Sequence, residues 1–161
     1  MKCKIVNNFL EEKQFLSLQS LITSDTFAWY LVKGINNIGD DHYQLVHSIY
    51  KSYEVNSAFF NNLKPLIEKL KPRSLIRIKA NFIPKTHKII EHGYHTDFNY
   101  SNSKTAVYYI NSNNGYTKFK KNNLVCKSEE NKIIIFDSKE EHTGTSCTNS
   151  DYRIVININY F

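Results

Sequence analysis

Hydrophobic and polar positions follow two different periods along this chain, and the change occurs near residue 72. Before it, apolar residues recur at helical spacing in segments 11–23 and 57–70, which predicts two amphipathic helices. Ser57 is a suitable N-cap for the second helix, but Pro65 lies inside that helix and argues against an unbroken one. The rest of this half is predicted as strands at 4–9, 27–32 and 43–53 and a loop at 34–41.

After residue 72 the pattern alternates with the period of a strand. The clearest case is segment 75–83, in which apolar side chains alternate with Arg77, Lys79 and Asn81. Further strands are predicted at 104–111, 116–119, 124–127, 132–136 and 152–161. Helices followed by a run of short antiparallel strands predict an α+β chain, mainly β, whose second half closes into a barrel or jelly roll.

Length and composition indicate one globular domain. The chain has 161 residues, of which 41% are hydrophobic and 14% aromatic, and no repeat or low-complexity linker divides it. We therefore expect a single domain in which residues 1–72 give helical support and residues 73–161 form the β core. The net charge of +6 suits an anionic partner, either nucleic acid or an acidic cosubstrate, but no long basic run singles out nucleic acid.

Cysteine content and hydropathy indicate a cytoplasmic protein. Three cysteines without CxxC spacing predict neither a disulfide framework nor a zinc ribbon. Glu11 and Glu12 interrupt the N-terminus before an apolar core forms, so no signal peptide is expected, and no apolar stretch has membrane-spanning length. We expect no membrane partner, and a monomer or weak dimer.

The candidate chemistry begins at His95-Thr96-Asp97. In an extended backbone His95 and Asp97 point to the same side. His142, which follows the apolar strand 132–136 and its turn, would add a third ligand from a distant part of the chain. Two histidines and one carboxylate on one face of a metal leave the opposite face open, as in non-haem Fe(II) oxygenases. Taken singly, a His-x-Asp is weak evidence, and a lone histidine is more often a hydrogen-bonding residue.

Arg153 opens the last predicted strand, and alternation puts it on one face with Val155 and Asn157. A guanidinium binds carboxylates through two parallel hydrogen bonds, so Arg153 is a candidate to bind an anionic cosubstrate near the metal. The alternative is an arginine on an edge strand that pairs with a surface carboxylate.

The order of these motifs, HTD, then AVYYIN, then a histidine, then an arginine opening a final strand, resembles the 2-oxoglutarate/Fe(II)-dependent oxygenase superfamily. Its prolyl 4-hydroxylase-like branch is the most similar, and the resemblance covers residues 75–161. It implies a double-stranded β-helix (a jelly roll, cupin-like) with the N-terminal helices packed on its outer sheet. It also implies that His95, Asp97 and His142 are the catalytic Fe(II) ligands and that Arg153 binds the distal carboxylate of 2-oxoglutarate.

The resemblance extends to further site residues. Tyr109, the second tyrosine of AVYYIN, matches a tyrosine whose hydroxyl contacts the same carboxylate, and Asn157 matches a polar position near the cosubstrate. Arg77 and Asn81 lie on the polar face of their strand and are assigned to the substrate side, with solvent exposure as the alternative. Asn159 stands where nucleic-acid demethylases of this superfamily carry a second arginine, which argues against that branch.

The resemblance implies a dioxygenase that uses Fe(II), 2-oxoglutarate and O2 to hydroxylate an unactivated C–H bond, with release of succinate and CO2. The expected partner is a small molecule or peptide, including a prolyl or peptidyl substrate, and nucleic acid is not expected. The alternatives are a non-catalytic, metal-binding cupin-like module and a nucleic-acid-modifying oxygenase. A composition rich in Asn, Lys and Ile suits a phage-encoded enzyme that acts in the host cytoplasm.

Overall fold

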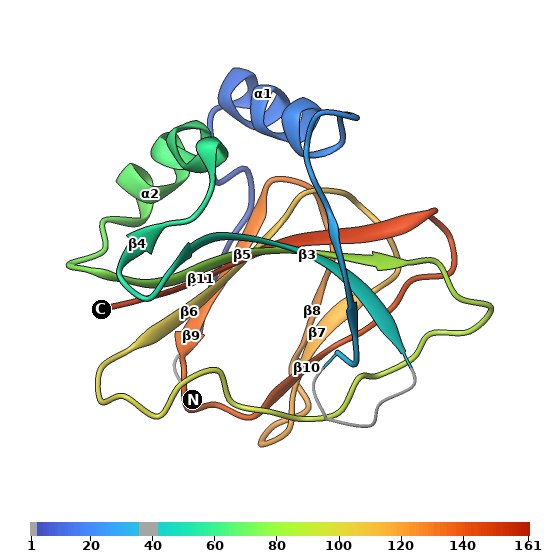
Figure 1. Cartoon of the computed structure of the whole chain (residues 1–161). Coiled ribbons are helices and arrows are strands. Elements are labelled where there is room, and N and C mark those ends of the chain that lie inside the picture. The colour runs from blue at the N-terminus through green and yellow to red at the C-terminus, as the bar shows by residue number, and fades with distance from the viewer. Residues whose placement is uncertain (1–2, 36–41) are drawn as a thin grey trace.

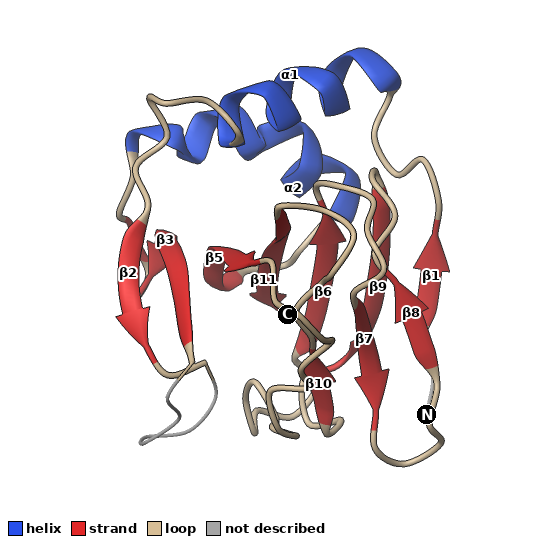
Figure 2. Cartoon of the chain, turned by 90° about the vertical axis from the view of Figure 1, so that its right-hand side faces the viewer, coloured by secondary structure: helices blue, strands red, loops and turns tan. Residues whose placement is uncertain are grey.

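The computed structural model describes residues 3–35 and 42–161 and shows two antiparallel sheets facing each other, with helices on the outside (Figures 1 and 2). The elements in chain order are β1 (Lys4–Val6), α1 (Glu12–Ile22), β2 (Tyr30–Lys33), β3 (Tyr43–Lys51), β4 (Glu54–Val55), the 3₁₀ helix η1 (Ala58–Leu63), α2 (Lys64–Leu70), β5 (Leu75–Pro84), β6 (Lys104–Tyr109), β7 (Tyr116–Phe119), β8 (Val125–Lys127), β9 (Lys132–Asp137), β10 (His142–Gly144) and β11 (Tyr152–Tyr160).

The larger sheet has the strand order β1-β9-β6-β11-β5-β3-β2, with β4 paired to β3, and the smaller sheet has the order β10-β7-β8. Neighbouring strands in both sheets are antiparallel. This arrangement is a jelly roll, or double-stranded β-helix, so the predicted fold class is confirmed. The first 72 residues supply not only helices but also β1 to β4.

The main core lies between the helices and the outer face of the larger sheet. Alternation in β5 and β11 turns one set of side chains outward, where it meets the apolar stripe of α1 and the buried residues of η1 and α2. Figure 2 shows these helices lying together on one side of the strands. Burying each large apolar side chain stabilises the fold by roughly 1.5–3 kcal/mol. The central members of this core are Phe15, Leu18, Ile22, Leu63, Leu66, Ile78, Ala80, Ile154, Ile156 and Ile158.

A smaller apolar cluster lies between the two sheets. It includes Val107, Tyr109, Phe119, Phe136 and Val155, which come from both sheets. Two members of this cluster, Val107 and Val155, also line a pocket together with polar side chains. The space between the sheets therefore holds both a packed apolar core and a polar pocket.

Several predicted elements differ from the structure. The strands predicted at 4–9 and 43–53 are shorter, ending at Val6 and Lys51. The segment predicted as one helix over 57–70 is a 3₁₀ helix followed by α2, and Pro65 lies in the first turn of α2, where its missing N–H removes no helical hydrogen bond. Ser57 does cap the segment, because its Oγ accepts from the N–H of Phe59 at 3.1 Å. The strand predicted at 27–32 begins only at Tyr30, since Phe27 turns into the core.

The loop predicted at 34–41 falls mostly outside the described residues. Among the residues that are described, no helix is long and apolar enough to cross a membrane.

Candidate active site

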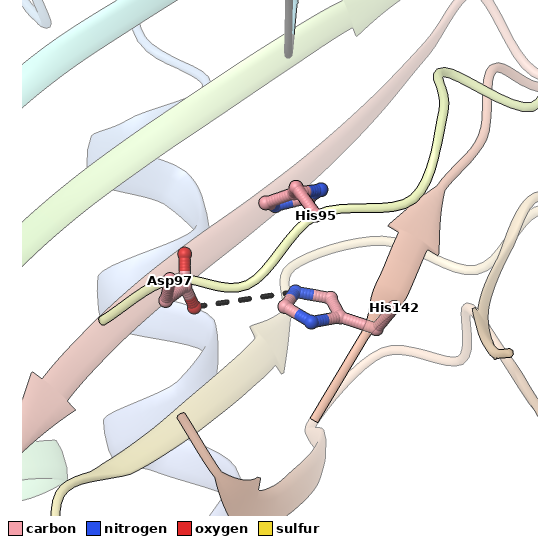
Figure 3. Close-up of side chains that lie close together, drawn as sticks. All are labelled: His95, Asp97 and His142. Atoms are coloured by element: carbon pink, nitrogen blue, oxygen red, sulfur yellow. Dashed lines mark ion pairs between the residues drawn. The ribbon is translucent and has the colours of Figure 1, made fainter. Parts of the chain in front are cut away.

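The structure brings His95, Asp97 and His142 together, with their ligand atoms all within 4.8 Å of one another. His95 and His142 form an antiparallel bridge in which each N–H donates to the other's carbonyl at 3.0 Å. This bridge holds the extended segment before Asp97 alongside β10. Figure 3 shows the three side chains pointing toward one another, with His142 Nε2 4.0 Å from Asp97 Oδ2.

The main chain sets the orientation of the His142 ring. Its Nδ1 lies 3.0 Å from the carbonyl oxygen of Glu140, and because a carbonyl only accepts, Nδ1 carries the proton. Nε2 then faces Asp97 and is the ring nitrogen left for a metal. The ring is 3% exposed and packs edge-on against Phe136. Such a fixed tautomer is typical of metal-binding histidines.

His95 is held neutral. Burial, followed by repulsion from His142, lowers the pKa of His95 to about 4. Its buried Nδ1 has no hydrogen-bond partner within the described part of the chain. A neutral imidazole with an unused buried nitrogen suits a metal ligand, because metals bind the deprotonated ring.

Asp97 is held by three donors. Arg77 Nη2 donates to Oδ1 at 2.9 Å, while Thr105 Oγ1 at 2.7 Å and Asn159 Nδ2 at 3.1 Å donate to Oδ2. Burial raises the pKa of Asp97, but His142, Arg77 and the Thr105 hydrogen bond outweigh it and hold the pKa below its ordinary value. The carboxylate is therefore ionised and fixed in place. The triad offers two imidazole nitrogens and one carboxylate, a donor set that fits Fe(II).

Arg153 is buried without a counter-charge. The residue is 2% exposed, and its Nε donates to Ser128 Oγ at 2.8 Å and its Nη2 to Thr117 Oγ1 at 3.3 Å. Across residues 3–35 and 42–161, no acidic side chain forms an ion pair with it. An unpaired buried charge is costly, so this guanidinium is suited to an anionic ligand with two or more oxygens.

Arg153 and the triad open into the same pocket of about 210 Å³. Its apolar walls include Val107 and Val155, and its polar lining includes Thr117 and the inner faces of β5 and β11. The lining residues that sequence reasoning assigned to the site are Arg77, Asn81, His95, Asp97, His142, Arg153 and Asn157. The pocket thus joins the candidate metal ligands to the candidate cosubstrate arginine.

Some site residues have positions that the sequence did not predict. Tyr109 does not line the pocket: its hydroxyl donates to Thr117 Oγ1 at 2.8 Å, and Thr117 in turn accepts from Arg153. Arg77 does line the pocket, but it is engaged with Asp97. Asn157 Oδ1 is buried and, in the described residues, has no hydrogen-bond partner.

Four contributors were missed by sequence reasoning, namely Thr105, Thr117, Ser128 and Asn159. Alternation along β6 and β11 would have put Thr105 and Asn159 on the inner face, but nothing in the sequence shows which residues they contact. Lys79, which also lines the pocket, was recognised only as part of a polar face.

No protein-family model matches the sequence, and no curated protein matches it either. Solved structures do share the fold. A prolyl hydroxylase from Trichoplax adhaerens, in complex with a peptide fragment of the hypoxia inducible factor oxygen degradation domain, superposes with a TM-score of 0.69 at 14% identity, covering 99% of this chain and 83% of that one. A prolyl-4-hydroxylase from Pseudomonas putida superposes with 0.68 at 10% identity, covering 98% and 91%.

The non-heme alpha ketoglutarate dependent epimerase SnoN, from nogalamycin biosynthesis, superposes with a TM-score of 0.66 at 12% identity, covering 99% of this chain and 76% of that one. The chain therefore has the double-stranded β-helix fold that these oxygenases share. Because an epimerase and prolyl hydroxylases have the same fold, the likeness does not define the reaction.

Proposed function

We propose that this protein is an Fe(II)- and 2-oxoglutarate-dependent dioxygenase that hydroxylates an unactivated C–H bond and releases succinate and CO2. The observation that carries the proposal is one pocket that joins a His-Asp-His cluster to a buried arginine without a counter-charge. Neither feature alone is specific to this chemistry. Together they offer ligands for a metal and, in the same pocket, a cation that can bind a dicarboxylate.

In this proposal His95, Asp97 and His142 hold the iron, and Arg153 binds the distal carboxylate of 2-oxoglutarate. The iron, with 2-oxoglutarate and O2, supplies the oxidising power when bound. The other residues of the chain hold these groups in place. Arg77, for example, orients Asp97 through its hydrogen bond to Oδ1.

Tyr109 acts through Thr117, because its hydroxyl fixes the Thr117 hydroxyl that Arg153 contacts. Asn157 presents a buried polar group to the pocket. A prolyl or peptidyl substrate is the finer form of the proposal. It is supported by the prolyl hydroxylases among the structures of the same fold, one of which is a complex with a peptide.

The proposal is tested by measuring succinate formed from 2-oxoglutarate by the Fe(II)-loaded protein in air, without added substrate. We expect turnover in the wild type and none in His95→Ala or Asp97→Ala. His87→Ala is the matched control, because His87 is exposed and outside the pocket. Wild-type turnover in either ligand variant would refute the assignment of the metal site.

A second measurement tests Arg153. In the Mn(II)-loaded protein, Arg153→Ala should raise the Kd of 2-oxoglutarate by about 30-fold or more, since removing one partner of a buried charge pair costs about 2–5 kcal/mol. Mn(II) binding should persist. A protein that binds metal but neither binds nor converts 2-oxoglutarate would instead be a non-catalytic cupin-like module.

A further inference from the structure

The side chain of Lys79 makes no polar contact with residues 3–35 or 42–161. Lys79 lies on the inner face of β5, between Arg77 and Asn81, and lines the pocket. Across the described residues it forms no hydrogen bond or ion pair through its side chain. Burial, then repulsion from Arg77, lowers the pKa of Lys79 to about 8, so the group is still mainly charged at pH 7.

The other charges of the pocket are already accounted for. Arg77 is paired with Asp97, which is the pocket's only carboxylate among the described residues. Arg153 lies near the start of β11, whereas Asn159, which hydrogen-bonds to Asp97, lies near its end. Arg153 is therefore separated from Asp97 along the strand. Lys79 is therefore a third cation of the pocket. Neither the candidate metal ligands nor the binding of 2-oxoglutarate by Arg153 accounts for its charge.

Strand register puts Lys79 beside a second unpartnered polar group. The Cα atoms of Lys79 and Asn157 are partners in the β5–β11 ladder, and Asn157 Oδ1 is the buried oxygen without a hydrogen bond. A lysine with a purely structural role would pair with an acid or extend its ammonium to bulk water. Two adjacent polar groups that line one pocket, the Lys79 ammonium as a donor and Asn157 Oδ1 as an acceptor, indicate a place for a polar ligand, in which the anionic group would meet Lys79.

We propose that Lys79 forms a second anion subsite of the pocket and binds a carboxylate or other anionic group of the primary substrate. This inference rests on the proposed function and narrows it: the substrate is a small acid, an amino acid or a peptide with an acidic group near the oxidised carbon. An uncharged C–H substrate would leave the Lys79 charge without a partner.

The test uses the Mn(II)- and 2-oxoglutarate-loaded protein and two probes of the same shape, propionate and propionamide. Mn(II) broadens the proton NMR lines of a small molecule bound near it, so line width reports binding in the pocket without turnover. We expect the wild type to broaden propionate about fivefold more than propionamide, the ratio given by about 1 kcal/mol of charge attraction. Lys79→Met should abolish this difference, and Lys79→Arg should retain it.

Lys85→Met is the matched control, because Lys85 is exposed just beyond the end of β5. It should behave as the wild type. The proposal is overturned if the wild type does not distinguish the probes, or if Lys79→Met still does. It is also overturned if Lys79→Met raises the Kd of 2-oxoglutarate as much as Arg153→Ala, because Lys79 would then belong to the cosubstrate site.

Failure of the proposed function has a different outcome. The wild-type protein would then not bind 2-oxoglutarate at all, whereas the comparison of propionate with propionamide on the Mn(II)-loaded protein would still decide whether Lys79 binds anions.

Discussion

Thr105 offers a sensitive test of how the candidate metal site is held, because among the described residues its hydroxyl makes the shortest hydrogen bond to Asp97. Thr105→Val keeps the shape of the side chain but removes the donor at 2.7 Å from Asp97 Oδ2. It also removes the acceptor that orients Asn159 Nδ2, at 2.9 Å. One net hydrogen bond to a charged group contributes about 1.5–3 kcal/mol, and loss of such a partner typically lowers metal affinity by about 10–100-fold.

The measurement is calorimetric titration of Mn(II) into the folded protein, well below the unfolding temperature of each variant. Thr86→Val is the control, because Thr86 Oγ1 donates to the Lys88 carbonyl at 2.6 Å and lies 2.6 Å from Ser146 Oγ without touching Asp97. We expect Thr105→Val to weaken Mn(II) binding by about 10-fold or more and the control by less than about twofold. Equal affinities in Thr105→Val and wild type would refute the view that Thr105 holds Asp97 as a ligand.

Three further predictions concern the pocket. Gly115→Ala should destabilise the protein by about 1–3 kcal/mol and weaken 2-oxoglutarate binding, because a Cβ there would lie 2.7 Å from Arg153 Cδ. Gly144→Ala is the control: its Cβ would lie 3.6 Å from Arg153 Nη1, so its thermal unfolding should be nearly unchanged. Lys79→Met should flatten the rise in stability that the wild type shows between pH 8 and 10.5. In that window Lys79 binds more protons in the unfolded chain than in the folded one, so the wild type gains stability relative to the mutant as the pH rises. Urea unfolding measured across this pH range tests the prediction. Tyr109→Phe should raise the Kd of 2-oxoglutarate by less than about tenfold, far less than Arg153→Ala, since it removes a neutral hydrogen bond behind Thr117.

The fold was predictable where the hydrophobic pattern is strict. Alternation in segments 75–83 and 152–161 identified β5 and β11 and separated the core face from the site face. The pattern failed where tertiary contacts override local preference. Phe27 is aromatic and reads as strand, yet it packs against Trp29 and Phe59 in a turn before β2.

For the site, the sequence predicted the motif residues and the strand face on which each residue lies, but not their cross-strand partners. Asn159 shows the limit: its Cα partners are Thr105 on β6 and Arg77 on β5, so register alone lines up the three donors to Asp97. Alternation assigns each of these residues to the inner face, but it does not say which residues lie opposite each other across strands that are distant in sequence. Sequence reasoning therefore named the three candidate ligands that the structure brings together, but it missed the residues that hydrogen-bond to Asp97.

The two arginines of the pocket show what side-chain partners add to a pattern. Arg77 and Arg153 are equivalent in the sequence, since each lies on the polar face of an alternating strand. In the structure Arg77 pairs with Asp97. Among the described residues the polar partners of Arg153 are neutral: it donates to the hydroxyls of Ser128 and Thr117 and lies over the ring of Tyr109. A cation that is already paired with a candidate metal ligand, as Arg77 is with Asp97, orients that ligand. A buried cation with neutral partners, such as Arg153, is still available to pair with an incoming anion. The same criterion distinguishes Lys79 from Arg77, and it is why we assign Arg153 to the cosubstrate and Lys79 to the substrate.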